Sequence, residues 1–252
     1  MSRPNAGAAG LVAKALEAVS RQQTIEARSL YSQALRMGAT GAEADTIRAE
    51  LARLSEESLL GPQVIDGDPL VSRYVIQTGD TLEKIAAKFK LSPEFLAEMN
   101  RIADKNRIRA GQTLKALNGP FRAEVDASSY ALDLFLGDVF VRRYRVGLGQ
   151  DDSTPRGEWR VGTKLKNPTY YPPRGGKIVA ADDSDNPLGE RWIALEGVSG
   201  EAVGQQRYGI HGTNEPDSIG KSVSLGCVRL KNTDAEQVYN YLVSGHSTVI
   251  VK

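Results

Sequence analysis

The single cysteine of this 252-residue chain, Cys227, has neighbours that suit the transfer of an acyl group. A cysteine that attacks an acyl carbon needs a base to take its proton and hydrogen-bond donors for the developing oxyanion. His211 ends an apolar run sixteen residues earlier, which leaves enough chain for a loop to return beside it. His246 stands in a Gly-His-Ser turn and is predicted to have no catalytic role. The spacing favours Cys227 as nucleophile and His211 as base.

Two further residues near the cysteine suit the same chemistry. Gly226 carries no side chain, so backbone N–H groups beside it can face a substrate carbonyl. If the segment is extended, Cys227 and Arg229 project to the same face. Arg229 is therefore expected to bind a substrate carboxylate through two parallel hydrogen bonds.

The stretch YGIHGTNEPDSIGKSVSLGCVRLKN resembles the signature of the L,D-transpeptidase, or YkuD-like, family. That signature is a His-Gly pair, a loop, and then Ser-His-Gly-Cys followed by a hydrophobic residue and Arg or Asn. The similarity includes GLGQDDSTPRGEWRVGTKLKNPTYYP and NPLGERWIAL and covers nearly all of residues 121–252. It implies a β-sandwich-like catalytic domain over residues 119–252.

The resemblance also implies roles for single residues. Cys227 is the expected nucleophile, His211 the base, the Gly212 carbonyl the group that orients the imidazole, and the amides of Gly226 and Cys227 the oxyanion donors. The residues expected to support or contact substrate are Tyr208, Asn214, Ser224 and Arg229. Residues 164–186, which contain Pro172-Pro173 and Gly175-Gly176, are expected to form a mobile lid over the donor groove.

One position departs from the family pattern, because Leu225 stands where the family commonly has histidine. A leucine can neither accept a proton nor donate a side-chain hydrogen bond. His211 is therefore left as the base of the motif, and the change bears on turnover rather than on fold.

A second motif precedes the catalytic segment, over residues 73–118. A strand at 74–76, a turn, two helices and a closing strand at 113–117 are predicted from the apolar spacing. Asp80 and Glu83 have capping-box spacing, and Ser92-Pro93 marks the start of the second helix.

The segments YVIQTGDTLEKIAAKF, LSPEFLAEMN and IRAGQTLKAL resemble a LysM module, which implies binding of N-acetylglucosamine-containing glycans. The expected binding lips are the turn at 78–81 and the loop at 100–108. Their candidate residues are Gly79, Asp80, Thr81, Asn100 and Ile108.

The first sixty residues are predicted to be helical, with apolar positions at helical spacing and a break at 37–41. The segment EARSLYSQAL resembles one arm of a tetratricopeptide-type hairpin. An amphipathic pair that packs or spaces is favoured over a surface for a protein partner, although such a partner stays open. Residues 61–72, rich in Gly and Pro, are a predicted linker.

The elements that must position the catalytic residues are mainly strands. Runs at 132–136 and 139–141 flank Gly137-Asp138 as a hairpin, and further strands are expected at 191–196, 208–211 and 248–251. Thr233 and Glu236 are predicted to cap a helix that Gly245 could end.

Composition narrows the function further. The net charge is +1, which disfavours a nucleic-acid partner, and one cysteine excludes an intramolecular disulfide. No run is long and apolar enough to span a membrane, and the first residues lack the order of a signal peptide. No metal or cofactor is expected. The resemblances imply a place in the bacterial cell envelope, in the periplasm or the cell wall, although no targeting segment is evident in this sequence.

The resemblances together predict a multidomain L,D-transpeptidase that forms a thioester on Cys227 and cross-links third-position diamino acids of peptidoglycan stems. Carbapenem-type β-lactams are expected to acylate the same thiol. The acceptor stays open: water would make the protein an L,D-carboxypeptidase, a free D-amino acid an exchange enzyme, and a lipoprotein amine a wall anchor. A weakly catalytic or inactive wall-binding scaffold and, more remotely, a cysteine peptidase are the alternatives.

Overall fold

The structure is a computed structural model that describes residues 6–172 and 175–252. The chain divides into two compact units. One comprises the residues up to Gly119 together with Leu134–Arg143, and the other comprises Pro120–Asp133 and Tyr144–Lys252.

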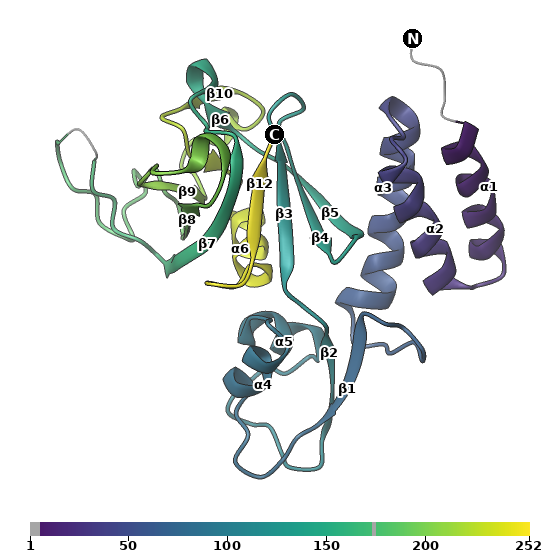
Figure 1. Cartoon of the computed structure of the whole chain (residues 1–252). Coiled ribbons are helices and arrows are strands. Elements are labelled where there is room, and N and C mark those ends of the chain that lie inside the picture. The colour runs from purple at the N-terminus through teal and green to yellow at the C-terminus, as the bar shows by residue number, and fades with distance from the viewer. Residues whose placement is uncertain (1–5, 173–174) are drawn as a thin grey trace. The chain divides into compact units, whose positions relative to one another are not determined.

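The first unit begins with three helices rather than the two of a single hairpin (Figure 1). They are α1 (Ala6–Ser20), α2 (Thr24–Arg36) and α3 (Gly41–Ser55), and a π-helical turn, η1 (Glu56–Leu60), continues α3. The predicted break at 37–41 is confirmed, because it joins α2 to α3. The predicted apolar stripe of α3 is also confirmed, since Ala44, Ile47, Leu51 and Leu54 are all buried.

The helices share their core with the tip of a β-hairpin. Strands β4 (Ala131–Leu136) and β5 (Val139–Arg145) form the predicted hairpin, and Gly137 in the turn has a φ of 56°. Phe140 is 1% exposed among the helix residues, and its carbonyl accepts a hydrogen bond from Ser55 Oγ at 3.2 Å. This tip therefore belongs to the same compact unit as the helices.

A buried polar network fastens residues 61–72 within the first unit. Arg28 donates to both carboxylate oxygens of Asp68, at 2.7 and 2.8 Å, and to Ser58 Oγ at 2.9 Å. Both partners of the ion pair are almost fully buried. Because a half-broken buried pair leaves an uncompensated charge, this bidentate contact fixes the segment in place.

The LysM-like segment has the predicted order of strand, helix, helix and strand. The elements are β1 (Val71–Val75), α4 (Leu82–Lys88), α5 (Pro93–Met99) and β2 (Thr113–Leu117), and the two strands pair antiparallel. Ser92 caps α5 as predicted, because its Oγ accepts from the Phe95 N–H at 3.0 Å.

The capping box predicted from Asp80 and Glu83 is wrong. Thr81 caps α4 instead, with its Oγ1 accepting from Lys84 N. Asp80 holds the preceding turn, because its carboxylate accepts from Gln77 N and from Tyr74 Oη, both at 2.8 Å. A carboxylate within reach of a turn amide and a phenol competes successfully for those donors.

The second unit carries most of an eight-stranded sheet, in the order β11-β9-β8-β7-β12-β3-β4-β5. The elements not yet given are β3 (Phe121–Asp126), β7 (Gly157–Lys166), β8 (Arg191–Gly197), β9 (Tyr208–His211), β11 (Val228–Arg229), β12 (Thr248–Val251), the separate pair β6 (Leu148–Gly149) and β10 (Ser222–Ser224), and the 3₁₀ turns η2 (Gln150–Asp152), η3 (Gly200–Ala202) and η4 (Pro216–Ser218). The strands expected at 191–196, 208–211 and 248–251 are confirmed. The core of this unit includes Trp159 on β7, which is 1% exposed.

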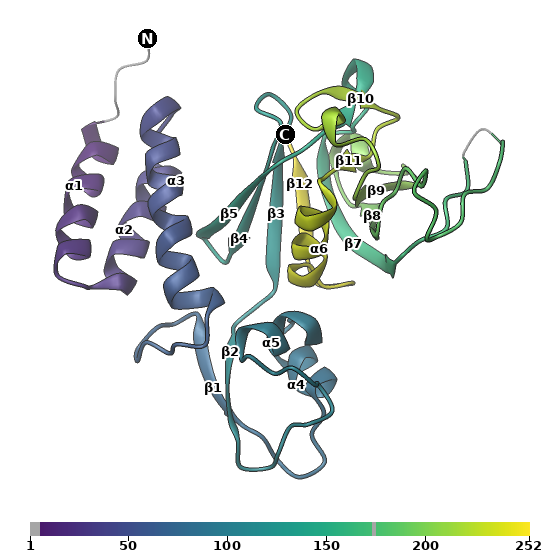
Figure 2. The ribbon, with the colours of Figure 1, turned by 180° about the vertical axis from the view of Figure 1, so that it is seen from behind.

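Helix α6 (Asn232–Tyr241) packs against β8 and β9 (Figure 2). The capping box predicted from Thr233 and Glu236 is wrong, since the helix begins at Asn232, with Lys231 at its N-cap position, and has no side-chain cap. Asn232 Oδ1 accepts from Thr213 N at 2.9 Å, and Glu236 pairs with Arg191. The helix ends at Tyr241, four residues before Gly245. Glu236, which the local pattern assigned to the cap, is therefore engaged by a tertiary partner instead.

Candidate active site

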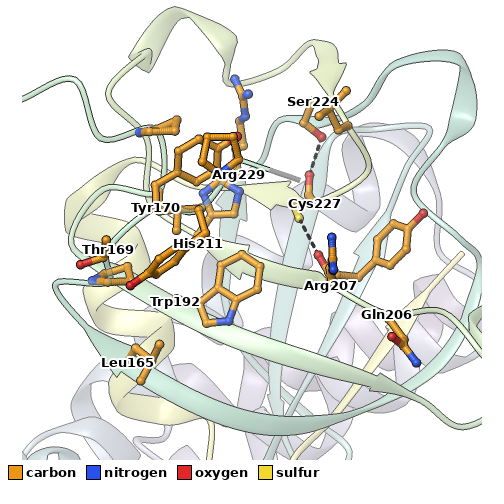
Figure 3. Close-up of a pocket in the computed structure, with 17 residues that line it drawn as sticks. Leu165, Thr169, Tyr170, Trp192, Gln206, Arg207, His211, Ser224, Cys227 and Arg229 are labelled. Atoms are coloured by element: carbon orange, nitrogen blue, oxygen red, sulfur yellow. Dashed lines mark hydrogen bonds between the residues drawn. The ribbon is translucent and has the colours of Figure 1, made fainter. Parts of the chain in front are cut away.

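Two neighbouring strands bring Cys227 beside the histidine strand. β11 pairs in parallel with β9, with Val228 opposite Ile210 and Arg229 opposite His211. Cys227 immediately precedes β11 and lies at the wall of a pocket of about 770 Å³, which His211 also lines (Figure 3). The loop return predicted from the sixteen-residue spacing thus takes the form of a parallel strand pair.

His211 is buried at 4% exposure and is held by two contacts. Its Nδ1 lies 2.6 Å from the carbonyl oxygen of Gly212. Because a carbonyl can only accept, Nδ1 carries the proton and Nε2 keeps its lone pair. The imidazole also stacks on the Trp192 ring, with centroids 5.6 Å apart and planes at 24°.

Burial lowers the pKa of His211 to about 4, and the nearby charge of Arg229 acts in the same direction. The hydrogen bond to Gly212 opposes both effects but is weaker than burial. The imidazole is therefore neutral at pH 7, which is the form that can accept a proton.

Cys227 is half-buried, and its Sγ lies 3.7 Å from the carbonyl oxygen of Arg207. Burial raises the pKa of the thiol, while a hydrogen bond from the Gly209 backbone and the charge of Arg229 lower it to a smaller extent. At neutral pH the resting pair is thus a neutral thiol beside a neutral imidazole. Attack on a carbonyl then requires a base at the moment of reaction.

The turn before Cys227 is fixed by Ser224, which is 2% exposed. Its Oγ donates to the Cys227 carbonyl at 2.7 Å and accepts from the Gly226 N–H at 3.1 Å. Gly226 has a φ of 124°, and a Cβ there would lie 2.5 Å from the Tyr208 ring. Only glycine fits this position without moving its neighbours.

The hydrogen bonds of Ser224 affect one of the two backbone amides expected to donate to the oxyanion. The Gly226 N–H points to Ser224 Oγ in this arrangement, so it is engaged within the turn. The Cys227 amide remains as the other donor that the sequence led us to expect.

Arg229 forms an ion pair with Glu215, with 2.9 Å between Nη1 and Oε2. The Arg229 side chain is 16% exposed and that of Glu215 is 65% exposed. The Nε of Arg229 is buried and has no hydrogen-bond partner among the described residues. Asn214 is exposed and is not part of the pocket wall, whereas Tyr208, Ser224 and Arg229 line it.

The pocket wall includes residues that the sequence analysis did not single out. These are Leu165, Pro168, Thr169, Tyr170, Tyr171, Pro187, Leu188, Trp192, Gln206 and Arg207. Leu225 also lines the pocket and is 56% exposed, so an apolar side chain stands where the family motif has an imidazole.

The expected lid contributes Leu165 and residues 168–172 to the wall. Two backbone hydrogen bonds join Tyr170 to Val179 and so connect the two arms of this segment. Buried Asn186 connects them further. The Asn186 amide donates to the carbonyls of Pro168 and Ala180, at 2.8 and 3.1 Å. Pro173 lies outside the described residues. Across residues 6–172 and 175–252, no group of three or more His, Cys, Asp or Glu is arranged to hold a metal.

The candidate glycan-binding residues lie on two loops of the LysM-like segment. Asn100 is occupied structurally, since it bonds the Lys115 backbone N–H and carbonyl and the Leu96 carbonyl. Thr81 caps α4 and Asp80 holds the turn, while Gly79 has a φ of 87°. Ile108 is half-buried on the second loop.

A thiol and an imidazole on adjacent strands, facing one pocket of a mostly β domain, define a class of enzyme built for acyl transfer. The family comparison makes this more specific. Residues 120–251 match the L,D-transpeptidase catalytic domain and residues 74–116 match the LysM domain. The chain therefore belongs to the L,D-transpeptidase family and carries a LysM domain ahead of its catalytic domain.

Two curated relatives and one solved structure are similar to this chain. A protein named putative L,D-transpeptidase YkuD from Bacillus licheniformis is 32% identical over 68% of this chain and 94% of its own length. Its namesake from Bacillus subtilis is 31% identical over 70% of this chain and 97% of its own length. An L,D-transpeptidase structure from Mycobacterium tuberculosis aligns over 72% of this chain and 89% of that one, with 14% identity and a TM-score of 0.42.

Proposed function

We propose that this enzyme joins peptidoglycan stems through a thioester on Cys227. The observation that carries the proposal is the state of His211, whose Nδ1 is bonded to the Gly212 carbonyl and whose Nε2 is left as an acceptor beside the thiol strand. A base held in this tautomer is suited to accept the thiol proton and to return it to a leaving amine.

In the first half-reaction, Cys227 Sγ attacks the carbonyl carbon of the third residue of a donor tetrapeptide, and its proton passes to His211 Nε2. The tetrahedral intermediate collapses, the C–N bond to the terminal D-amino acid breaks, and His211 protonates the departing amine. The Cys227 amide supports this step as a donor to the oxyanion.

In the second half-reaction, the side-chain amine of another stem attacks the thioester. It loses a proton to His211, the C–S bond breaks, and the thiol is restored. The product is a cross-link between two third-position diamino acids. Arg229 is the proposed contact for a stem carboxylate, because its guanidinium lines the pocket and can form two parallel hydrogen bonds.

The LysM domain would hold the enzyme on glycan and raise the local concentration of stems. The proposed place of the protein is therefore the bacterial cell envelope, in the periplasm or the wall. No helix among the described residues is long and apolar enough to span a membrane.

Product analysis with a defined tetrapeptide tests the proposal. Native protein should release the terminal D-alanine and give a cross-linked dimer by mass spectrometry, and Cys227→Ala should give neither. Tripeptide without dimer would replace the transpeptidase by an L,D-carboxypeptidase.

A wall-binding scaffold is the second candidate, and the exposed Leu225 favours it, because this position lacks the imidazole of the family motif. Acylation by imipenem separates the two. An active enzyme should gain the mass of one carbapenem at Cys227, and His211→Gln should slow this reaction. A thiol that stays unmodified in the native protein would support the scaffold.

A further inference from the structure

Trp192 contacts His211 of the proposed catalytic pair and Gly209 beside it, although neither composition nor motif singles it out. On β8 it lies directly opposite His211 of β9, and its ring stacks on the imidazole. Gly209 is the next residue of β9 on the same face, since alternate residues of a strand share a face.

The indole lies across Gly209. A Cβ at this glycine would meet Trp192 Cη2 at 2.6 Å and Cζ2 at 2.7 Å. The missing side chain is therefore what makes room for the ring. The Gly209 backbone in turn offers a hydrogen bond to the Cys227 sulfur.

We infer that Trp192 is a positioning residue, which holds the His211 imidazole and the Gly209 backbone in the mutual placement that Cys227 needs. This inference rests on the proposed function of Cys227 and His211. Trp192 acts through the histidine and the glycine and exchanges no proton itself.

The physical reason is that one contact does not fix an imidazole. The hydrogen bond to Gly212 fixes where Nδ1 lies, and the stacked indole fixes the ring plane, so that the direction of Nε2 is set. The face of an indole also attracts cations, so it stabilises the imidazolium that forms when the thiol gives up its proton.

The charged groups around the imidazole act differently. From β11, Arg229 disfavours the imidazolium, and Glu215 offsets part of that charge. On β8, Arg191 precedes Trp192 and is paired with Glu236. The stacked indole is thus a neutral group that favours the charged histidine.

Alkylation of Cys227 by iodoacetamide tests the inference without requiring any transpeptidation. Because the chain has one cysteine, the mass of the whole protein reports the reaction. Trp192→Leu should lower the rate at pH 7 by about tenfold, a part of the 10²–10⁴ that a positioned base provides. Trp192→Phe, which keeps an aromatic face, should restore most of the rate.

Two comparisons separate positioning from general damage. Above the pKa of the thiol no base is needed, so wild type and Trp192→Leu should react equally fast there. In a double-mutant cycle, Trp192→Leu should add little to His211→Gln, because both act through one imidazole. Val198→Ala, an exposed site just past the other end of β8, is the matched control and should leave the rate unchanged.

The inference is overturned if Trp192→Leu reacts like wild type at pH 7, or if its effect adds in full to that of His211→Gln. Should the leucine variant fail to fold, tryptophan fluorescence of the native protein decides. Protonation of His211 near pH 4 should quench the stacked indole, and His211→Gln should remove this transition; identical titrations would contradict the stacking role.

If the native protein formed no cross-links, the inference about Trp192 would still stand, because the alkylation rates are measured without a stem peptide. Conversely, an unreactive thiol in the native protein at every pH would remove the proposed function and the inference with it.

Discussion

The positive charge of Arg229 acts on the catalytic pair, and the negative charge of Glu215 partly offsets it. The charge of Arg229 lowers the pKa of both His211 and Cys227, while Glu215 pairs with its outer nitrogen. A substrate carboxylate that approached the guanidinium would have to compete with Glu215. Glu215 is therefore placed to weaken binding of donors that present a free carboxylate.

Replacing Glu215 tests this competition. Glu215→Gln should lower the KM for a donor with a free stem carboxylate a few-fold, in line with the 0.2–1 kcal/mol of an exposed ion pair. The amidated donor should show no gain. Steady-state kinetics with both donors measure the effect, and Asp217→Asn, an exposed acid in the same loop, is the control. Equal gains for the two donors would show that the charge acts at long range.

The buried His211 predicts a loss of stability in acid. The unfolded chain binds a proton below its ordinary pKa of about 6.5, whereas the folded imidazole does so only near 4. Stability should therefore fall as the pH drops between these values, by about 3 kcal/mol at most, at 1.4 kcal/mol per pH unit.

Urea unfolding at pH 7 and at pH 4.5 measures this fall. His211→Gln should lose less stability between the two conditions than wild type does. His246→Gln, an exposed turn position, should behave like wild type. A steeper fall in His211→Gln would mean that the imidazole is protonated in the folded state.

The sequence was sufficient to predict that the chain returns Cys227 to the neighbourhood of His211, where both line one pocket, because that motif needs only residue identity and spacing. It was not sufficient for Trp192, whose role depends on the register between β8 and β9. Nor could it reveal that the Gly226 amide is engaged by Ser224. Contacts of this kind are set by the path of the backbone, which spacing alone does not specify.

At the level of elements, Lys115 on β2 joins the LysM domain to the end of the helical region. Its Nζ donates to the carbonyls of Ser58, Gly61 and Gln63, at 2.8, 2.7 and 2.6 Å. Burial lowers the pKa of this lysine to about 8, an effect that Asp68 opposes. The ammonium therefore satisfies carbonyls that the end of η1 leaves without partners.

Removing this ammonium should destabilise the first unit. Lys115→Met leaves three carbonyls without this donor, of which the bond to Ser58 is buried and the other two are part-buried. At about 1–3 kcal/mol for one unsatisfied buried group, the loss should be about 1–3 kcal/mol. Urea unfolding at pH 7 measures it. Lys84→Met, an exposed lysine of the same domain, should change stability by less than 0.5 kcal/mol, as is usual for surface sites. A neutral Lys115→Met would mean that water replaces the ammonium.

Local signals predicted some element boundaries and failed at others. Ser92 began α5 as its Pro93 neighbour indicated, because its hydroxyl accepts from the Phe95 N–H within the first turn. Thr233 failed as a cap because α6 starts where Asn232 bonds back to Thr213. Strand β7 was not predicted from the sequence, because exposed and buried residues alternate in only half of its length.

The whole chain combines a glycan-binding domain with a catalytic domain, and its turnover should depend on the form of the substrate. On intact sacculi, soluble N-acetylglucosamine oligomers should slow cross-linking, because they compete for the LysM domain. On soluble tetrapeptides the same oligomers should have no effect. Parallel assays with the native chain measure both, and inhibition of both reactions would locate glycan binding at the catalytic pocket instead.

The neutral thiol of Cys227 has a consequence for its reaction with oxidants. Peroxides attack thiolates rather than thiols, and the first product, a sulfenic acid, is normally rescued by a second cysteine. This chain has no second cysteine to provide that rescue. Burial, which disfavours ionisation of the sulfur, should therefore also make Cys227 less susceptible to oxidation.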